Sequence, residues 1–200
     1  MERKVQQVEQ LFERLEKEIA QFQDKTHLHC LAGCGNCCTT PSIEASPLEF
    51  FPWAHHLFLN DLAEQTLVDL QNKTSPLCHI FQPLALLDKT KGRCTDYLHR
   101  GLICRLFGYG AAKDTLGKLR LITCKIIKEN QAADYAKTVR AISAGQYVPI
   151  FSDYYMQLSQ IDFSLGRTML PINEALKRAL EEVLHYYAYR PIPKVLKNSA

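Results

Sequence analysis

The stretch C30-L-A-G-C34-G-N-C37-C38 places four cysteines within nine residues, which we call the 30–38 segment. Four more cysteines follow it, so all eight cysteines of the chain lie between positions 30 and 124. Free cysteine usually behaves as a small apolar core residue and does not gather in groups. Four thiols this close together indicate disulfides, a bound metal or a reactive dithiol.

The N-terminal sequence helps to choose among disulfides, a metal and a reactive dithiol, because it indicates the redox compartment of the protein. The first 25 residues alternate charged and apolar side chains and contain no apolar core of a secretory signal. No run of about 18 apolar residues is present that would cross a membrane. We therefore expect a cytoplasmic protein without a membrane partner. Structural disulfides are rare in that compartment, so metal binding is favoured, while inert thiols, redox thiols and disulfides stay open.

Length and composition indicate one domain with a core of its own. Two hundred residues fit a single domain, and 46% hydrophobic residues allow a core that does not depend on metal alone. The formal net charge is +3 when the thiols are counted as neutral. Eight thiolates would add −8 and two Zn²⁺ ions +4, which takes the charge to −1. A basic surface is then absent, so we do not expect a nucleic-acid partner.

Apolar residues at alternating steps of three and four predict an amphipathic helix over residues 1–25. The stripe consists of Val5, Val8, Phe12, Leu15, Ile19 and Phe22. We expect this helix to pack on its own domain. An oligomer formed through it as a coiled coil stays open as the alternative, as does a protein partner of unknown identity.

The fold class predicted for the whole chain is mainly α (α+β), a small metal-stapled single domain with a minor hairpin and flanking amphipathic helices. The cysteine-cluster metal-binding domain is predicted over 26–128, and a helical region packed on it over 129–200. Helices are expected near 130–144, 149–161 and 173–189, the last of them capped by Asn173.

Turn and cap signals divide the middle of the chain. Ser46-Pro47-Leu48-Glu49 reads as a capping box, and the helix that it opens is expected to break at Pro52 and resume near 61–71. An extended stretch is predicted at 77–81, and Thr90-Lys91-Gly92 as a turn. The segments 107–113 and 118–122 predict a hairpin.

The spacing of the cysteines suits a soft metal ion. Cys34-Gly35-Asn36-Cys37 is a C-x-x-C knuckle, and thiolates select Zn²⁺ or iron–sulfur clusters over hard cations. Gly33, Gly35 and Asn36 allow the backbone to turn tightly. The predicted metal ligands are Cys30, Cys34, Cys37, Cys38, Cys78, Cys94, Cys104 and Cys124.

The number of metal sites is left open by the adjacent pair Cys37 and Cys38. In an extended backbone these neighbours would point to opposite faces and could not easily bind one ion from one side. Two Cys₄ sites, a binuclear site with bridging sulfurs, and one Cys₄ site with four accessory thiols are all compatible with the spacing.

Charged and imidazole side chains lie near the cysteines in the sequence. Arg93 and Arg105 are adjacent to Cys94 and Cys104, and positive neighbours lower the pKa of a thiol. Four histidines near cysteines are alternative ligands. They are His27, His29, His79 and His99.

The ordered cysteine pattern resembles that of the bacterial YkgJ-like cysteine-cluster family. The matching motifs are Cys30-x3-Cys34-Gly35-x-Cys37-Cys38, a later Cys78, and Gly92-Arg93-Cys94-x-x-Tyr97-x-x-Arg100-x-x-x-Cys104-Arg105-x-Phe107. The resemblance runs from about His29 to Cys124 and implies a zinc- or iron-chelating CxxCxxCC domain, often called an iron–sulfur protein. Two departures are the three-residue first gap and the glycines Gly101 and Gly108 where prolines are common. The resemblance implies no particular reaction.

Three functions compete at this stage. The first is a cytosolic metal-binding protein that holds an iron–sulfur cluster or Zn²⁺; iron–sulfur is favoured because gaps of 39, 15, 9 and 19 residues are unlike paired zinc knuckles. The second is a thiol or redox enzyme that uses Cys34 and Cys37. The third is a zinc-stapled interaction module that uses the aromatic–basic stretch 186–190. No other catalytic motif is found, so whether the protein is an enzyme stays uncertain.

Overall fold

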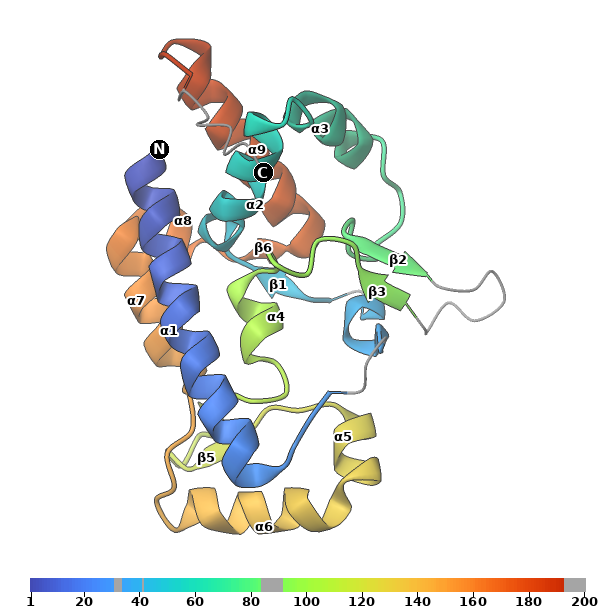
Figure 1. The fold of residues 1–200 in the computed structure, drawn as a ribbon, viewed down its shortest axis with the longest axis vertical. Coiled ribbons are helices and arrows are strands. Elements are labelled where there is room, and N and C mark those ends of the chain that lie inside the picture. Colours follow the sequence, from blue (N-terminus) through green and yellow to red (C-terminus); the bar gives the residue numbers. More distant parts are fainter. Residues whose placement is uncertain (31–33, 41, 84–91, 193–200) are drawn as a thin grey trace, which may run out of the picture.

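The computed structural model describes residues 1–30, 34–40, 42–83 and 92–192. The protein is 59% helical with small antiparallel strand pairs, which confirms the mainly α (α+β) class (Figure 1). The helices are α1 Glu2–Thr26, η1 Asn36–Thr39, η2 Pro47–Phe50, α2 Phe51–Leu59, α3 Ala63–Gln71, α4 Leu102–Leu106, α5 Lys125–Asn130, α6 Ala132–Ser143, α7 Phe151–Ile161, α8 Phe163–Arg167 and α9 Ile172–Ala188. The strands are β1 Glu44–Ala45, β2 Phe81–Pro83, β3 Gly92–Cys94, β4 Ala111–Lys113, β5 Leu119–Leu121 and β6 Leu170–Pro171.

The N-terminal helix α1 packs on its own domain, as predicted. Its apolar stripe is buried, and α1 contacts α2, α4, α6 and α7, which lie along it in Figure 1. Leu11 is buried in addition to the predicted stripe. Because the stripe is covered within the chain, its burial stabilises the monomer fold.

The main core is built around α9, which packs on η2, α2 and α3. Ser46 and Glu49 form the predicted capping box, which opens the 3₁₀ helix η2. Pro52 does not break the helix, contrary to the expectation, because it lies in the first turn of α2, where a missing N–H costs nothing. The chain breaks instead after Leu59 and resumes as α3.

A second, smaller core lies at the other end of the molecule. It contains residues from the end of α1, the β4–β5 hairpin and the helices α5 and α6. The hairpin is present where the sequence predicted it, with shorter strands. Helix α5 spans the predicted boundary between 26–128 and 129–200, and that boundary stays a prediction.

Several local predictions were wrong or fall outside the described residues. Only Phe81 of the stretch 77–81 lies in a strand, because Cys78, His79 and Ile80 form a turn that leads into β2. No local pattern in the sequence predicted the β2–β3 pair. In the predicted turn, Thr90 and Lys91 lie outside the described residues, and Gly92 belongs to β3.

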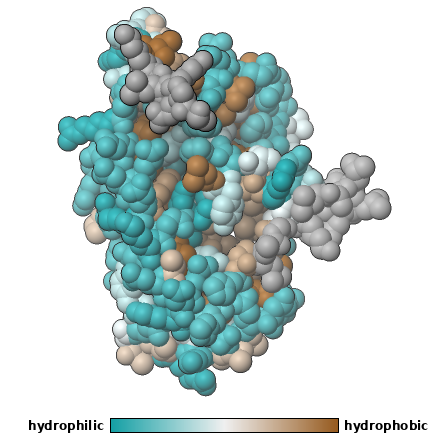
Figure 2. Space-filling model, viewed as in Figure 1, coloured by the Kyte–Doolittle hydropathy of each residue, from teal (hydrophilic) through white to brown (hydrophobic). Residues whose placement is uncertain are grey.

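The visible surface is mostly hydrophilic, with apolar residues in small separate patches (Figure 2). Within the described part of the chain, no helix has both the length and the apolar character needed to span a bilayer.

The packing of α1 gives a direct stability test. Leu15 is fully buried, so Leu15→Ala should lower the free energy of unfolding by about 2–5 kcal/mol, because it leaves a cavity. Urea denaturation followed by circular dichroism measures this change. Glu13→Ala, at an exposed position of the same helix, is the control and should change stability by less than about 0.5 kcal/mol. Equal effects of the two variants would contradict the packing of α1 described above.

Candidate metal centre

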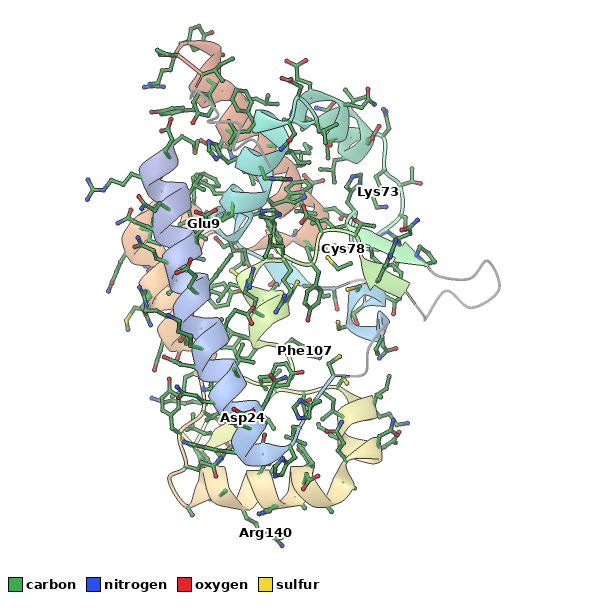
Figure 3. The ribbon with its side chains drawn as sticks, viewed as in Figure 1. Glu9, Asp24, Lys73, Cys78, Phe107 and Arg140 are labelled. Atoms are coloured by element: carbon green, nitrogen blue, oxygen red, sulfur yellow. The ribbon has the colours of Figure 1, made fainter. Side chains whose placement is uncertain are left out.

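Five separate segments of the chain carry the eight cysteines. Cys30 follows α1, Cys34 precedes η1, and Cys37 and Cys38 lie within it. The other four are Cys78 in the turn before β2, Cys94 at the end of β3, Cys104 in α4 and Cys124 at the N-cap of α5. Figure 3 shows Cys78 in the middle of the molecule, with further sulfur atoms between it and α5. All eight cysteines are free thiols.

The backbone at Cys37 and Cys38 is a 3₁₀ helix, so the expectation based on an extended backbone was wrong. Their two Sγ atoms are 4.0 Å apart. Sulfurs bound to one tetrahedral Zn²⁺ at about 2.3 Å would be about 3.8 Å apart. The pair can therefore serve one ion or two neighbouring ions. Their hydrogen bond lowers the pKa of the Cys37 thiol and raises that of Cys38.

The ring of Phe81 presses the 30–38 segment against the β2–β3 pair. A Cβ added at Gly35 would come within 2.3 Å of the Phe81 ring, and one added at Gly92 within 2.2 Å. Neither glycine has a positive φ, so close approach of the ring is the reason for glycine at both positions. Phe81 pairs with Cys94 across the two strands, so Cys94 lies opposite the residue whose ring contacts Gly35.

Asn173 holds the turn that carries Cys78. Its side-chain oxygen accepts a hydrogen bond from the backbone N–H of His79 at 2.8 Å, and its nitrogen donates to the carbonyl of Leu77 at 2.9 Å. The same nitrogen donates to the carbonyl of Ser75 at 3.3 Å. The predicted role of Asn173 as a helix cap was wrong, because the helix already begins at Ile172. Sequence reasoning could not find this role, since the contact joins positions about 95 residues apart.

Glu49 fixes the start of α4, the helix that carries Cys104. Its fully buried carboxylate accepts hydrogen bonds from the backbone N–H groups of Ser46 at 2.6 Å and Ile103 at 2.7 Å, and from the Tyr155 hydroxyl at 3.2 Å. Burial raises the pKa of this carboxyl to about 7, against the opposing effect of these hydrogen bonds. The capping box predicted the contact with Ser46, but nothing in the sequence indicated the contact with Ile103.

Arg105, which follows Cys104 in the sequence, is engaged mainly with other groups. It turns toward α1, where it pairs with Glu16, and it donates to the carbonyl of Arg100 at 3.0 Å. Burial and then the charge of Cys78 raise the pKa of Cys104 well above the ordinary value, and Arg105 does not offset them. Burial raises the pKa of Cys94, and the positive charge of Arg100 opposes this rise without cancelling it.

One group of thiols belongs to the main core. Cys78 is 7% exposed and lies in that core, and Cys38, Cys94 and Cys104 pack against it. Burial is the main reason why the pKa of Cys78 rises to about 11, and the charge of Cys94 adds to it. Cys38 in turn is influenced by the charges of Cys104 and Cys78.

The remaining thiols lie toward the second core. Partial desolvation of its sulfur raises the pKa of Cys30 to about 11, together with the charges of Cys34, Cys37 and Cys124 and a hydrogen bond with Cys34, although the residue as a whole is exposed. Cys124 packs against the second core, and its Sγ accepts from the backbone N–H of Ile127 at 3.4 Å. Cys30 is the one cysteine of the eight that is exposed.

The eight thiols are donors of the type that a soft cation prefers, but they do not yet surround a common point. Within the described residues, which include all eight cysteines, no three His, Cys, Asp or Glu side chains already meet at metal-binding geometry. Among the alternative ligands, His99 pairs with Asp96 at 2.7 Å and stacks on His56. Burial lowers the pKa of His79. Thiolates are the donors that a soft cation prefers.

A comparison with protein families gives one match. A family model named CxxCxxCC and described as "Putative zinc- or iron-chelating domain" matches residues 29–137, which is more than half of the chain. Neither the curated proteins nor the solved structures compared with this chain gave a match.

The anchoring of Cys78 can be tested by Asn173→Asp. The new carboxylate can still accept from His79 but faces two carbonyl oxygens without a donor, so stability should fall by about 1–3 kcal/mol. Mass spectrometry should detect several-fold faster alkylation of Cys78. The exposed neighbour variant Glu174→Gln is the control and should leave both quantities unchanged. Unchanged alkylation in Asn173→Asp would show that Asn173 does not hold the turn.

Proposed function

Since this chain belongs to the CxxCxxCC family of zinc- or iron-chelating domains, we propose that its eight cysteines are the metal ligands and that they hold iron–sulfur. The observation that carries the proposal is that eight free cysteines lie within the matched residues and that five of them pack in or against the two cores. Without a metal, burial favours the protonated form of Cys78 and Cys104. A bound soft cation would instead stabilise their thiolate forms.

Iron–sulfur is the form that we favour over zinc. Iron–sulfur clusters need cysteine alone as a ligand, and eight free cysteines are present within the matched residues. A thiolate-rich cluster carries negative charge, and Arg100 lies near enough to affect Cys94. A closed Cys₄ zinc site would be purely structural, with no open position for water.

The surrounding residues support such a centre by orienting its ligands. Glu49 fixes the start of α4 next to Cys104, and Asn173 fixes the turn of Cys78. Both hydrogen bonds are made to backbone groups, so they set the position of a cysteine without competing for the metal. A cytoplasmic location is part of the proposal, because a reducing compartment keeps thiols available as ligands.

A thiol enzyme that uses Cys34 and Cys37 is the second candidate. The pKa of Cys37, lowered by its hydrogen bond with Cys38, favours a reactive thiolate. Its structural setting differs from that of redox C-x-x-C motifs, which occur near a βαβ unit. In the described residues the named strands form antiparallel pairs. The metal content separates this function from the first.

An interaction module based on the stretch 186–190 has less support. Tyr187 is buried and stacks on Phe58, and Tyr186 lies edge-on against Tyr187. The guanidinium of Arg190 lies over the Tyr186 ring. These contacts are those of aromatic residues at the edge of a core rather than of a free stacking surface.

The proposal is tested by metal analysis of the purified protein. We expect iron and acid-labile sulfide, with a brown visible spectrum, from protein prepared without oxygen. Cys104→Ser should lose at least half of the metal per folded chain, because it removes a proposed ligand that packs against the main core. Leu102→Ala, at a fully buried position of the same helix, is the control: it should lower stability but retain metal per folded chain. Folded wild-type protein free of iron and zinc would contradict the proposal.

A further inference from the structure

We propose that Glu16 of α1 is a positioning residue for the metal centre and holds the segment between Cys94 and Cys104 in place. It does so through two arginines, Arg100 in the loop before α4 and Arg105 within α4. Glu16 lies 84 residues before Arg100 and 89 before Arg105, so no local pattern in the sequence predicts these contacts. The effect on metal affinity rests on the proposed function, whereas the effect on the segment itself does not.

One oxygen of the Glu16 carboxylate accepts hydrogen bonds from both arginines. It accepts from Arg100 at 2.7 Å, and it also pairs with Arg105. The side chain of Arg105 is 7% exposed and that of Arg100 is 15% exposed, so both charges are largely removed from water. A buried charge is costly unless it is paired and hydrogen-bonded. Within residues 1–30, 34–40, 42–83 and 92–192, Glu16 is the one carboxylate that forms an ion pair with either arginine.

The two arginines hold the backbone of the loop before α4. Arg105 donates to the carbonyl of Leu98 at 2.5 Å and to that of Arg100 at 3.0 Å. Arg100 donates to the carbonyl of Tyr97 at 3.0 Å. Three carbonyl groups of the loop are thus bound by the two guanidinium groups, so the course of the loop depends on where these groups lie.

Helix α1 offers Arg105 two contacts on successive turns. The guanidinium lies over the Phe12 ring, 4.4 Å from its centroid, and pairs with Glu16 one turn later. Residues four apart lie on the same face of a helix, so the ring and the carboxylate form one binding surface. Phe12 is buried in the main core, which fixes this surface relative to the rest of the chain.

Cys104 directly precedes Arg105 in α4, so the position of Arg105 affects the thiol. Without the Glu16 charge, two neighbouring cations remain with no carboxylate between them, and their repulsion favours movement of Arg105 toward water. The Glu16 side chain is itself 38% exposed, and an exposed ion pair contributes little. The effect therefore comes from the burial of Arg105, and Glu16 acts on Cys104 through that arginine.

The contacts are tested by alkylation of the full-length, reduced protein without metal. Glu16→Gln should raise the rate at Cys104 by about fivefold, measured by mass spectrometry, because the segment opens more often. The rate at Cys124, which packs against the second core, should not change. Glu13→Gln, at an exposed position of the same helix, is the control and should leave both rates unchanged. An unchanged rate at Cys104, or equal increases at both cysteines, would overturn the inference.

The part played by charge is tested by adding Arg100→Gln to Glu16→Gln. The double variant has one cation in place of two, so the alkylation rate of Cys104 should return at least halfway to that of the wild type. No return at all would show that repulsion is not the cause. Circular dichroism checks that each variant folds. If Glu16→Gln does not fold, Glu16→Asp replaces it; the shorter side chain should give about a twofold increase at Cys104 and none at Cys124.

Metal affinity links this positioning to the proposed function, and Zn²⁺ alone is the probe. Competition with a chromophoric chelator should show about tenfold weaker zinc binding by Glu16→Gln than by the wild type. Val5→Ala, at a buried position about three turns before Glu16, should lower stability but keep the wild-type zinc affinity.

The zinc results separate the two proposals. Equal losses of affinity in Val5→Ala and Glu16→Gln would mean that Glu16 contributes general stability, which would overturn the inference while metal binding stands. A wild-type protein that binds no Zn²⁺ and is isolated without iron or zinc would overturn the proposed function, and alkylation of Cys104 would still decide whether Glu16 holds the segment.

Discussion

The structure depends on one constraint, which is that free cysteines from distant parts of the chain are held in or against its two cores. Burial and neighbouring thiols raise the pKa of Cys78 and Cys104, which favours their protonated forms. A soft metal would stabilise the thiolate forms by coordination, so metal binding and the final packing of the middle of the chain should be coupled.

Backbone anchoring is the means by which distant segments meet. Glu49 and Asn173 both bind N–H or carbonyl groups next to a cysteine, and the Phe81 ring fills the space left by Gly35 and Gly92. The anchors come from η2, α9 and β2, which are themselves fixed in the main core. The helices thus position the short, irregular segments that carry the cysteines.

The sequence allowed the surrounding helices to be predicted better than the short segments that carry the cysteines. The amphipathic stripe of α1 and the capping box at Ser46 are local signals, and the structure confirms both. The turn at Cys78 and the true role of Asn173 depend on contacts across about 95 residues, which no local pattern carries. The pairing of Arg105 with Glu16 could not be predicted for the same reason, since the two residues are far apart in the chain. The ligand set was proposed from spacing alone and stays a prediction.

The most direct test of the account is X-ray absorption at the metal edge of the protein as isolated. Coordination by the cysteines predicts a first shell made of sulfur alone, at about 2.3 Å. For iron–sulfur, a second shell of iron should follow. A first shell dominated by nitrogen or oxygen, or a folded protein without any bound iron or zinc, would contradict the claim that these thiols form the metal centre.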